Sequence, residues 1–154
     1  MCRFGWILSG VLALAVGLLL YQFVIRGSVA PSPDGRTAIV LSEAERDLVL
    51  SEMRSFLVAV QGIVSATASD DFERVAEHAR SVGMAAQTGV PAKLIGKLPL
   101  AFKELGFATH DGFDRLALDA QQVRDTAAVQ PALAELLQKC VACHASYRLL
   151  AEGS

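Results

Sequence analysis

Residues 131–148 of the chain read PALAELLQKCVACHASYR. Their apolar spacing predicts a helix with Pro131 in its first turn. One side of this helix would carry Leu133, Leu136, Leu137, Cys140, His144 and Tyr147. Because positions i and i+3 of a helix project from nearly the same face, the two cysteines of the C-V-A-C-H run at 140–144 lie together, with His144 beside them.

Cys140, Cys143 and His144 form the C-x-x-C-H motif of covalent haem attachment. Each thiol can add to one vinyl group of the same haem, and the histidine can reach the iron below it. We therefore expect one haem c, with His144 as the proximal iron ligand.

Three other interpretations of the cysteine pair stay open. It could be a redox dithiol, half of a zinc site, or a chance spacing. A thioredoxin-like dithiol usually lies near a βαβ pattern, which this chain lacks. A zinc site would want further ligands close by, whereas His78 and His110 are far away in the sequence.

Residues 4–25 form an uncharged apolar run of 22 residues. As a helix this run is roughly 33 Å long, enough to cross a bilayer core. Trp6 and Tyr21 near its ends fit the membrane interfaces. We expect an uncleaved anchor at residues 1–26. The alternative is a cleaved signal with Ser28 and Ala30 as small residues, but Pro31 would then follow the cut.

The charge distribution argues against a nucleic-acid-binding surface. The first 30 residues hold two of the 14 basic residues and none of the 16 acidic residues. The remainder is therefore net acidic, whereas nucleic-acid binding needs a basic patch.

The remainder predicts a linker followed by one helical domain. Residues 27–41 begin with a stretch rich in Pro, Ser and Gly and are expected to be a spacer. Residues 42–154 are the expected haem-binding domain. Lysines alternate with apolar residues between positions 91 and 107, and Pro99 interrupts any long helix there. That segment is either a short helical cap or a basic surface facing haem propionates or a redox partner.

Four helices are expected in the domain. Ser42 and Glu45 form a capping box for the first, which should end near Ala66. Its inward stripe would be Val49, Met53, Phe56, Leu57, Val60 and Val64. Asp70 with Glu73 would open a second helix, whose stripe is Phe72, Val75, Ala76, Ala79 and Val82. Thr109 or Asp111 would start a third, with Phe113, Leu116, Ala117, Ala120 and Val123 inward.

Strand signals are nearly absent. The predicted fold class is therefore all-α: an antiparallel four-helix bundle with an N-terminal transmembrane helix.

The run C-V-A-C-H-A-S-Y-R at 140–148 resembles the class II c-type cytochromes, the cytochrome c-prime group. In that family C-x-x-C-H is followed by x-x-Tyr/Phe-Arg and lies on the last helix of a four-helix bundle. The resemblance implies that His144 is the proximal ligand and that Arg148 lies near the haem-binding face. Tyr147 and Arg148 could otherwise be ordinary core and surface residues.

The family also implies a residue on the first helix that faces the iron from the far side. Met53 lies at about that position, and a thioether ligand there would raise the reduction potential. The alternative is a core methionine that fills a gap. Met84 is a less favoured substitute, and we expect His78 and His110 to be solvent-facing or capping histidines.

These observations lead us to expect a membrane-tethered one-electron carrier rather than an enzyme. The haem domain would lie in the periplasm, held by a single pass through a bacterial inner membrane, or would be soluble there after signal cleavage. Expected partners are redox proteins, with a possible homodimer. The alternatives are a gas-binding haem protein for NO or CO, and an accessory haem subunit of a membrane redox complex.

Overall fold

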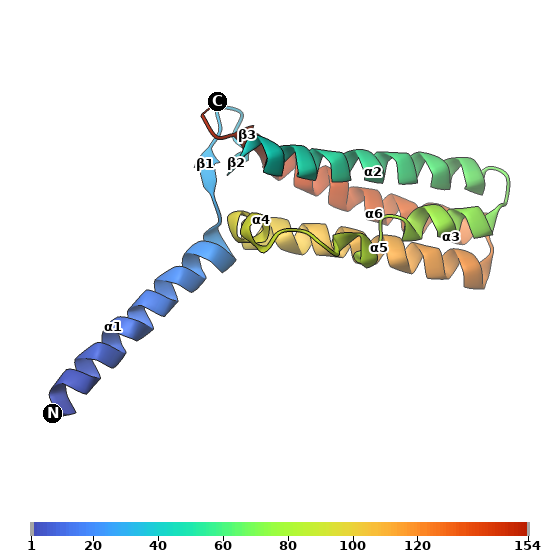
Figure 1. The fold of residues 1–154 in the computed structure, drawn as a ribbon. Helices are drawn as coiled ribbons and strands as arrows, with labels where there is room; N and C mark the ends of the chain where they lie inside the picture. Colours follow the sequence, from blue (N-terminus) through green and yellow to red (C-terminus); the bar gives the residue numbers. More distant parts are fainter. Residues whose placement is uncertain (1, 154) are drawn as a thin grey trace.

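The computed structural model describes residues 2–153, and it is mostly helical with an apolar N-terminal helix (Figure 1). Helix α1 (Cys2–Leu20) continues into a π-helical turn, η1 (Tyr21–Arg26). The stretch Gly5–Arg26 has a mean hydropathy of 2.2 and none of it is buried. It is long and apolar enough to span a membrane or to serve as a signal sequence. Helix α2 (Glu43–Thr67) passes the same length and composition test, but one of its faces is buried in the domain.

Helix α2 begins with the expected capping box. Glu45 N donates to Ser42 Oγ over 3.4 Å, and Ser42 N donates to Glu45 Oε2 over 2.9 Å. The helix ends at Thr67, one residue beyond the expected end. The prediction that Leu57 and Val64 face inward is wrong, because both side chains are exposed. Val49 is buried as predicted, and Ala59, Ile63 and Ala66 are buried in addition.

Helix α3 (Phe72–Arg80) starts close to its expected position, with Asp71 as its N-cap. The next two helix starts were predicted too late. Helix α5 (Leu100–Val123) begins directly after Pro99, whose carbonyl accepts hydrogen bonds from Phe102 N and Lys103 N. The proline therefore opens the long helix instead of preventing one, because the first helical turn does not need its missing N–H.

Helix α6 (Thr126–Ser146) is capped by Asp125, whose Oδ1 accepts from Ala127 N over 2.9 Å. Pro131 consequently lies inside the helix and not in its first turn. The earlier start adds Val129 to the buried side.

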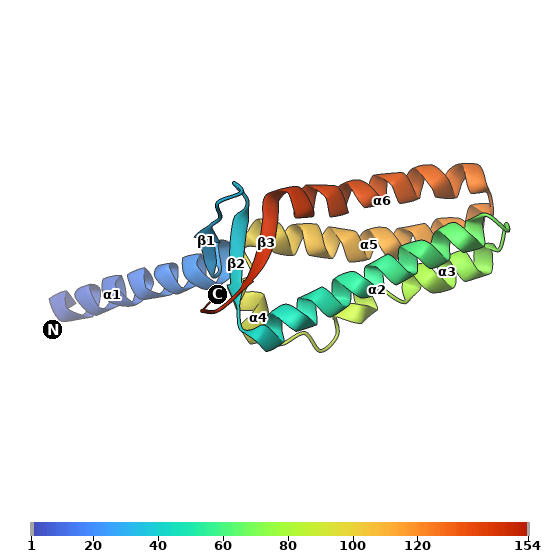
Figure 2. The ribbon, with the colours of Figure 1, turned by 90° about the horizontal axis from the view of Figure 1, so that it is seen from above.

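Helices α2, α3, α5 and α6 lie alongside one another, and the closest packing is between α2 and α3, α3 and α5, and α5 and α6 (Figures 1 and 2). The main core joins all four helices and includes Ile63, Val75, Phe113, Leu116, Ala117, Ala120 and Val129. Its several alanines allow the helices to approach closely. Figure 2 shows α2 and α6 splaying apart toward the end that carries α4 (Ala92–Lys97) and the sheet.

A three-stranded sheet covers that end, although no strand was expected. Strand β1 (Val29–Pro31) pairs antiparallel with β2 (Thr37–Leu41), and β2 pairs parallel with β3 (Tyr147–Ala151). Ile39 and Leu41 of β2 are fully buried. The segment 27–41, expected to be a spacer, is therefore mostly structured, because its apolar end finds a partner strand more than 100 residues later in the chain.

The end of the apolar helix is attached to the domain. Ser28 N donates to Lys97 O over 2.7 Å, and Lys103 Nζ donates to Val24 O over 2.8 Å. Gly27 is buried with φ +67°, a conformation that favours glycine. The lysine-bearing segment contains the short helix α4, with Leu94 buried, so a short helical cap over this end is present.

Candidate functional site

A cavity of about 400 Å³ lies where α2 and α6 splay apart. Helix α5 lines it between them, and α4 and the segment 81–90, which includes the 3₁₀ turn η2 (Met84–Gln87), complete its walls. Much of the lining is apolar: Val49, Phe56, Val82, Val90, Leu94, Leu98, Phe102 and Leu105. Helix α6 contributes Cys140, Cys143 and His144, and α2 contributes Met53. Four of the residues singled out in the sequence thus line one cavity.

Cys140 and Cys143 are half-buried free thiols one turn apart on α6. Burial raises the pKa of both thiols, and that of Cys143 reaches about 11 because the Cys140 sulfur adds to the effect. Reactive dithiol sites depend on a lowered thiol pKa, so these surroundings do not favour a redox dithiol.

His144 lies in the last turn of α6, exposed and at the edge of the cavity. Its backbone carbonyl accepts a hydrogen bond from Arg36 Nη1 over 3.3 Å. The imidazole has no hydrogen-bond partner among residues 2–153, so the backbone alone sets its position.

Met53 is half-buried on the cavity side of α2. It packs against a small apolar cluster formed by Ile39, Leu41, Val49, Leu94 and Phe102. Cys143 and Tyr147 pack against the same cluster. Helix α2, the first helix of the domain, therefore brings Met53 to the same cavity as the motif. Met84 is not among the residues that line the cavity, and it is 40% exposed.

Tyr147 and Arg148 lie on β3, beyond the helix. The Tyr147 ring meets Phe102 edge to face, with centroids 5.4 Å apart, so it supports the apolar cluster. Arg148 Nη1 donates to Ser32 Oγ over 3.2 Å and lies 3.7 Å from Asp34 Oδ2. The structure does not bring Arg148 to the cavity.

His110 is a cavity residue that the sequence analysis missed. It is 2% exposed, so the expectation of a solvent-facing or capping histidine is wrong. Its Nδ1 lies 2.7 Å from Val82 O, and its Nε2 lies 2.5 Å from Gln87 Nε2 and 3.4 Å from Glu52 Oε1. Burial alone would lower its pKa, but the hydrogen bonds with Glu52 and the Val82 carbonyl raise the pKa above its usual 6.5.

The misplaced start of α5 explains that error. A helix beginning at Thr109 or Asp111 would have left His110 in an exposed first turn. The observed helix places it mid-length, on the same side as Phe102, Phe113 and Ala117. The apolar residues recur at helical spacing from Phe102 onward, and this pattern could have indicated that the helix starts earlier and that His110 is buried. His78, by contrast, is half-buried with its ring close against the backbone at Gly62.

The residues that line the cavity fit a haem of the expected kind. The volume lies in the range of small-molecule and cofactor sites, and the walls are largely apolar. Two thiols and an imidazole face it from α6, and a thioether faces it from α2. Among residues 2–153, no group of three or more His, Cys, Asp or Glu side chains is placed to hold a metal ion.

Comparison with protein-family models, with curated proteins and with solved structures found no match for this chain.

Proposed function

We propose that this protein is a membrane-tethered monohaem c-type cytochrome that carries single electrons outside the cytoplasm. The observation that carries the proposal is the shared cavity of Cys140, Cys143, His144 and Met53. We further propose that α2, α3, α5 and α6 form an antiparallel four-helix bundle of the class II type, with the motif on its last helix.

The roles of the residues follow from their chemistry. The bound haem supplies reversible one-electron chemistry between ferric and ferrous iron. Cys140 and Cys143 would hold it covalently, His144 would serve as its proximal ligand, and Met53 would serve as its distal ligand. A thioether ligand favours the reduced iron and so raises the potential.

The exposure of α6 around the motif suits transfer to a partner. Val141 is exposed, and Ala142 and Ala145 beside it are exposed as well. His144, which lines the cavity, is itself exposed, so the site reaches solvent beside this residue, while α5 and α4 line other sides of the cavity. An electron carrier needs this combination of a shielded cofactor and one accessible edge.

The attachment of the apolar helix supports an uncleaved anchor. A cut near Ala30 would remove most of β1 and the hydrogen bond from Ser28 N to Lys97 O. Lys103 Nζ would also lose the carbonyls of Phe23 and Val24 as acceptors. The domain would then lie in the periplasm with its sheet end nearest the membrane, and redox proteins of that compartment would be its partners.

The test of this proposal is a pair of optical spectra, oxidised and reduced, of the haem-loaded protein and of Met53→Ala. We expect a low-spin spectrum with a methionine-to-iron charge-transfer band that disappears in Met53→Ala. Met84→Ala is the matched control, since Met84 lies outside the cavity, and it should retain the band.

Two outcomes would contradict the proposal. A high-spin spectrum that is unchanged in Met53→Ala and shifts with carbon monoxide or nitric oxide would exclude Met53 as a ligand and favour gas binding. A purified wild-type protein without covalent haem would overturn the assignment as a cytochrome.

A further inference from the structure

We propose that Arg36 is a positioning residue for His144: it binds the end of the motif helix and sets both the orientation of the proximal ligand and the charge beside it. The inference rests on the proposed function. Arg36 lies in the segment expected to be a spacer, and nothing in its local sequence indicates this role.

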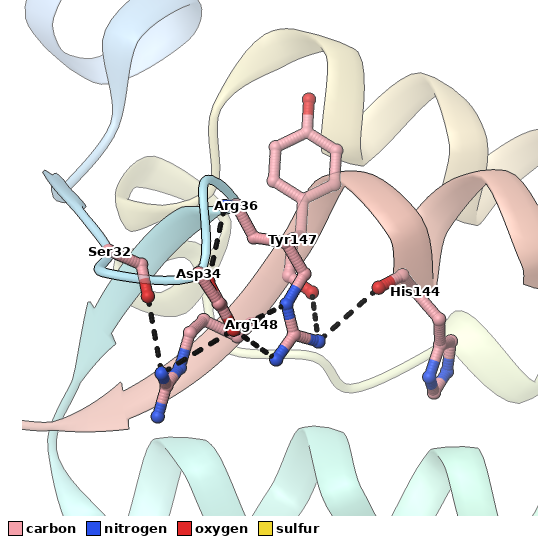
Figure 3. A network of polar contacts seen from close by, with 6 residues as sticks. All are labelled: Ser32, Asp34, Arg36, His144, Tyr147 and Arg148. Carbon is pink, nitrogen blue, oxygen red and sulfur yellow. Dashed lines mark hydrogen bonds and ion pairs between the residues drawn. The ribbon is translucent and has the colours of Figure 1, made fainter.

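The carbonyl groups at the end of α6 need partners. The last four carbonyls of a helix have no N–H partner within the helix itself. Arg36 Nη1 donates to His144 O over 3.3 Å and to Tyr147 O over 3.4 Å, as Figure 3 shows. One guanidinium therefore binds the proximal-ligand residue and the first residue of β3 together.

Arg36 is itself held in place by Asp34. The Oδ2 atom of Asp34 accepts from Arg36 Nε over 2.9 Å and from Nη2 over 2.6 Å (Figure 3). Hydrogen bonds from Arg36, and then from Ser32, hold the pKa of Asp34 well below its usual range. The carboxylate is thus charged across the physiological pH range, and it fixes the guanidinium on the tight turn between β1 and β2.

The pairing of β2 with β3 begins directly beside Arg36 and the end of α6. Thr37, directly after Arg36, is paired with Tyr147, directly after α6. Strand β3 follows the motif helix without any loop. The end of the motif helix is therefore joined to the sheet at the residue pair next to Arg36.

The imidazole of His144 lacks the support that ligating histidines usually have. Such a histidine generally donates its second ring N–H to a carbonyl or carboxylate, which fixes the ring. No such partner faces His144 among the described residues. The backbone of the last helical turn must therefore supply the orientation, and Arg36 binds that turn.

The charge of Arg36 has a second effect. A cation at the C-terminus of a helix offsets the negative end of the helix dipole. A positive charge close to the proximal ligand also favours the less positive oxidation state of a bound iron. Arg36 should accordingly raise the reduction potential of the site.

The experiment compares wild type with Arg36→Ala and Arg36→Lys, all loaded with haem. We expect Arg36→Ala to lower the reduction potential and to weaken the low-spin spectrum of the proximal and distal ligands. Arg36→Lys keeps a cation near the carbonyls and should restore much of both properties. Arg115→Ala is the matched control, because Arg115 is exposed and, within the described part of the chain, forms its ion pair with Asp111 on its own helix.

The thermal midpoint of each variant separates positioning from simple capping. A lower midpoint in Arg36→Ala with an unchanged potential and spectrum, measured where the protein is fully folded, would overturn the inference and leave Arg36 as a helix cap. Should Arg36→Ala fail to fold, Asp34→Asn frees the guanidinium while keeping its charge, and it should change the spectrum if positioning matters. Absence of covalent haem from wild type would overturn the proposed function and the role of Arg36 with it, whereas normal wild-type haem with unaltered variants would overturn only the role of Arg36.

Discussion

His110 is a buried imidazole whose two ring nitrogens both have polar partners. Glu52 on α2, Gln87 on η2 and the Val82 carbonyl face it. Since its pKa is raised by folding, the protonated imidazole is favoured in the native state. This contribution to stability is complete below the unfolded pKa of about 6.5 and is lost as the pH rises through the higher folded pKa.

We therefore expect His110→Gln to lower the free energy of unfolding by about 1–3 kcal/mol at pH 5.5, and by less at pH 8.5. Denaturant unfolding at several pH values measures this difference. His78→Gln is the control, because His78 has no carboxylate partner in the described chain. A penalty for His110→Gln that stays constant from pH 5.5 to 8.5 would show that its charge has no part in stability.

The cavity residues that the sequence indicated share one property: their signal is local. The motif is a run of five residues, and Met53 lies on a helical stripe that begins at a recognisable cap. His110 and Arg36 were missed because their positions depend on distant parts of the chain. The burial of His110 depends on where α5 starts, and the role of Arg36 depends on strand pairing with residues near 147.

Among the elements, α2 and α4 are joined by the most buried ion pair described. Lys97 Nζ lies 2.6 Å from Glu45 Oε2 and 2.7 Å from Glu152 Oε1. The hydrogen bond with Lys97, followed by the Ser42 backbone, lowers the pKa of Glu45 from 4.5 to about 2. A lowered pKa means that the stabilisation is complete above pH 4.5 and is lost as the pH falls toward 2.

Glu45→Gln tests this pair while retaining the capping box, in which glutamine also functions. We expect its unfolding free energy at pH 7 to fall by about 1 kcal/mol, and its stability to decline less steeply than that of wild type between pH 4.5 and 2. Acid titration followed by circular dichroism measures both. Glu43→Gln is the matched control in the same helical turn, and equal acid profiles for the two variants would exclude the ion pair as the cause.

Elements with strong local signals were predicted closely, and those with non-local partners were not. The capping box and amphipathic face of α2 predict its bounds to within one residue, whereas Pro99, which is predicted to interrupt a long helix, stands at the start of α5. The strands are short and their register is set across the chain, so no window of sequence contains both partners. A short apolar run such as the four residues 38–41 of β2 cannot be assigned to strand or helix by periodicity alone.

At the scale of the whole molecule, the junction at Gly27 decides whether the apolar helix and the domain move together. A Cβ placed on Gly27 would lie 2.4 Å from Lys97 O, and the residue has φ +67°. Gly27→Ala should therefore separate η1 from α4. We expect a loss of roughly 2–3 kcal/mol in unfolding free energy and faster tryptic cleavage after Arg26 in detergent.

Gly35→Ala is the matched control for that experiment. Gly35 also has a positive φ, +82°, but nothing lies within 4 Å of its Cβ position. Gly35→Ala should lower the free energy of unfolding by only about 1 kcal/mol, because alanine there meets the backbone penalty but no close neighbour. Equal effects of the two variants on stability and cleavage would show that the close approach to Lys97 does not hold the junction.

The helical character of the chain and its apolar N-terminal helix were predicted from composition and periodicity, and both are confirmed. The firm attachment between that helix and the domain was not predicted, because the Pro- and Ser-containing segment after it has the composition of a flexible spacer. In this segment Ser28 donates to the Lys97 carbonyl, and strand β2 pairs with the distant strand β3. Neither partner can be recognised from the sequence of the segment itself.

The parallel pairing of β2 with β3 has a consequence for the order in which the molecule assembles. The hydrogen bond between Arg36 and Tyr147 spans 111 residues of chain. Closing so long a loop is slow compared with forming helices, whose contacts are local. While the chain folds, the helices can therefore form before the sheet closes. The end of α6 that carries the two thiols is closed off only in the final step of folding.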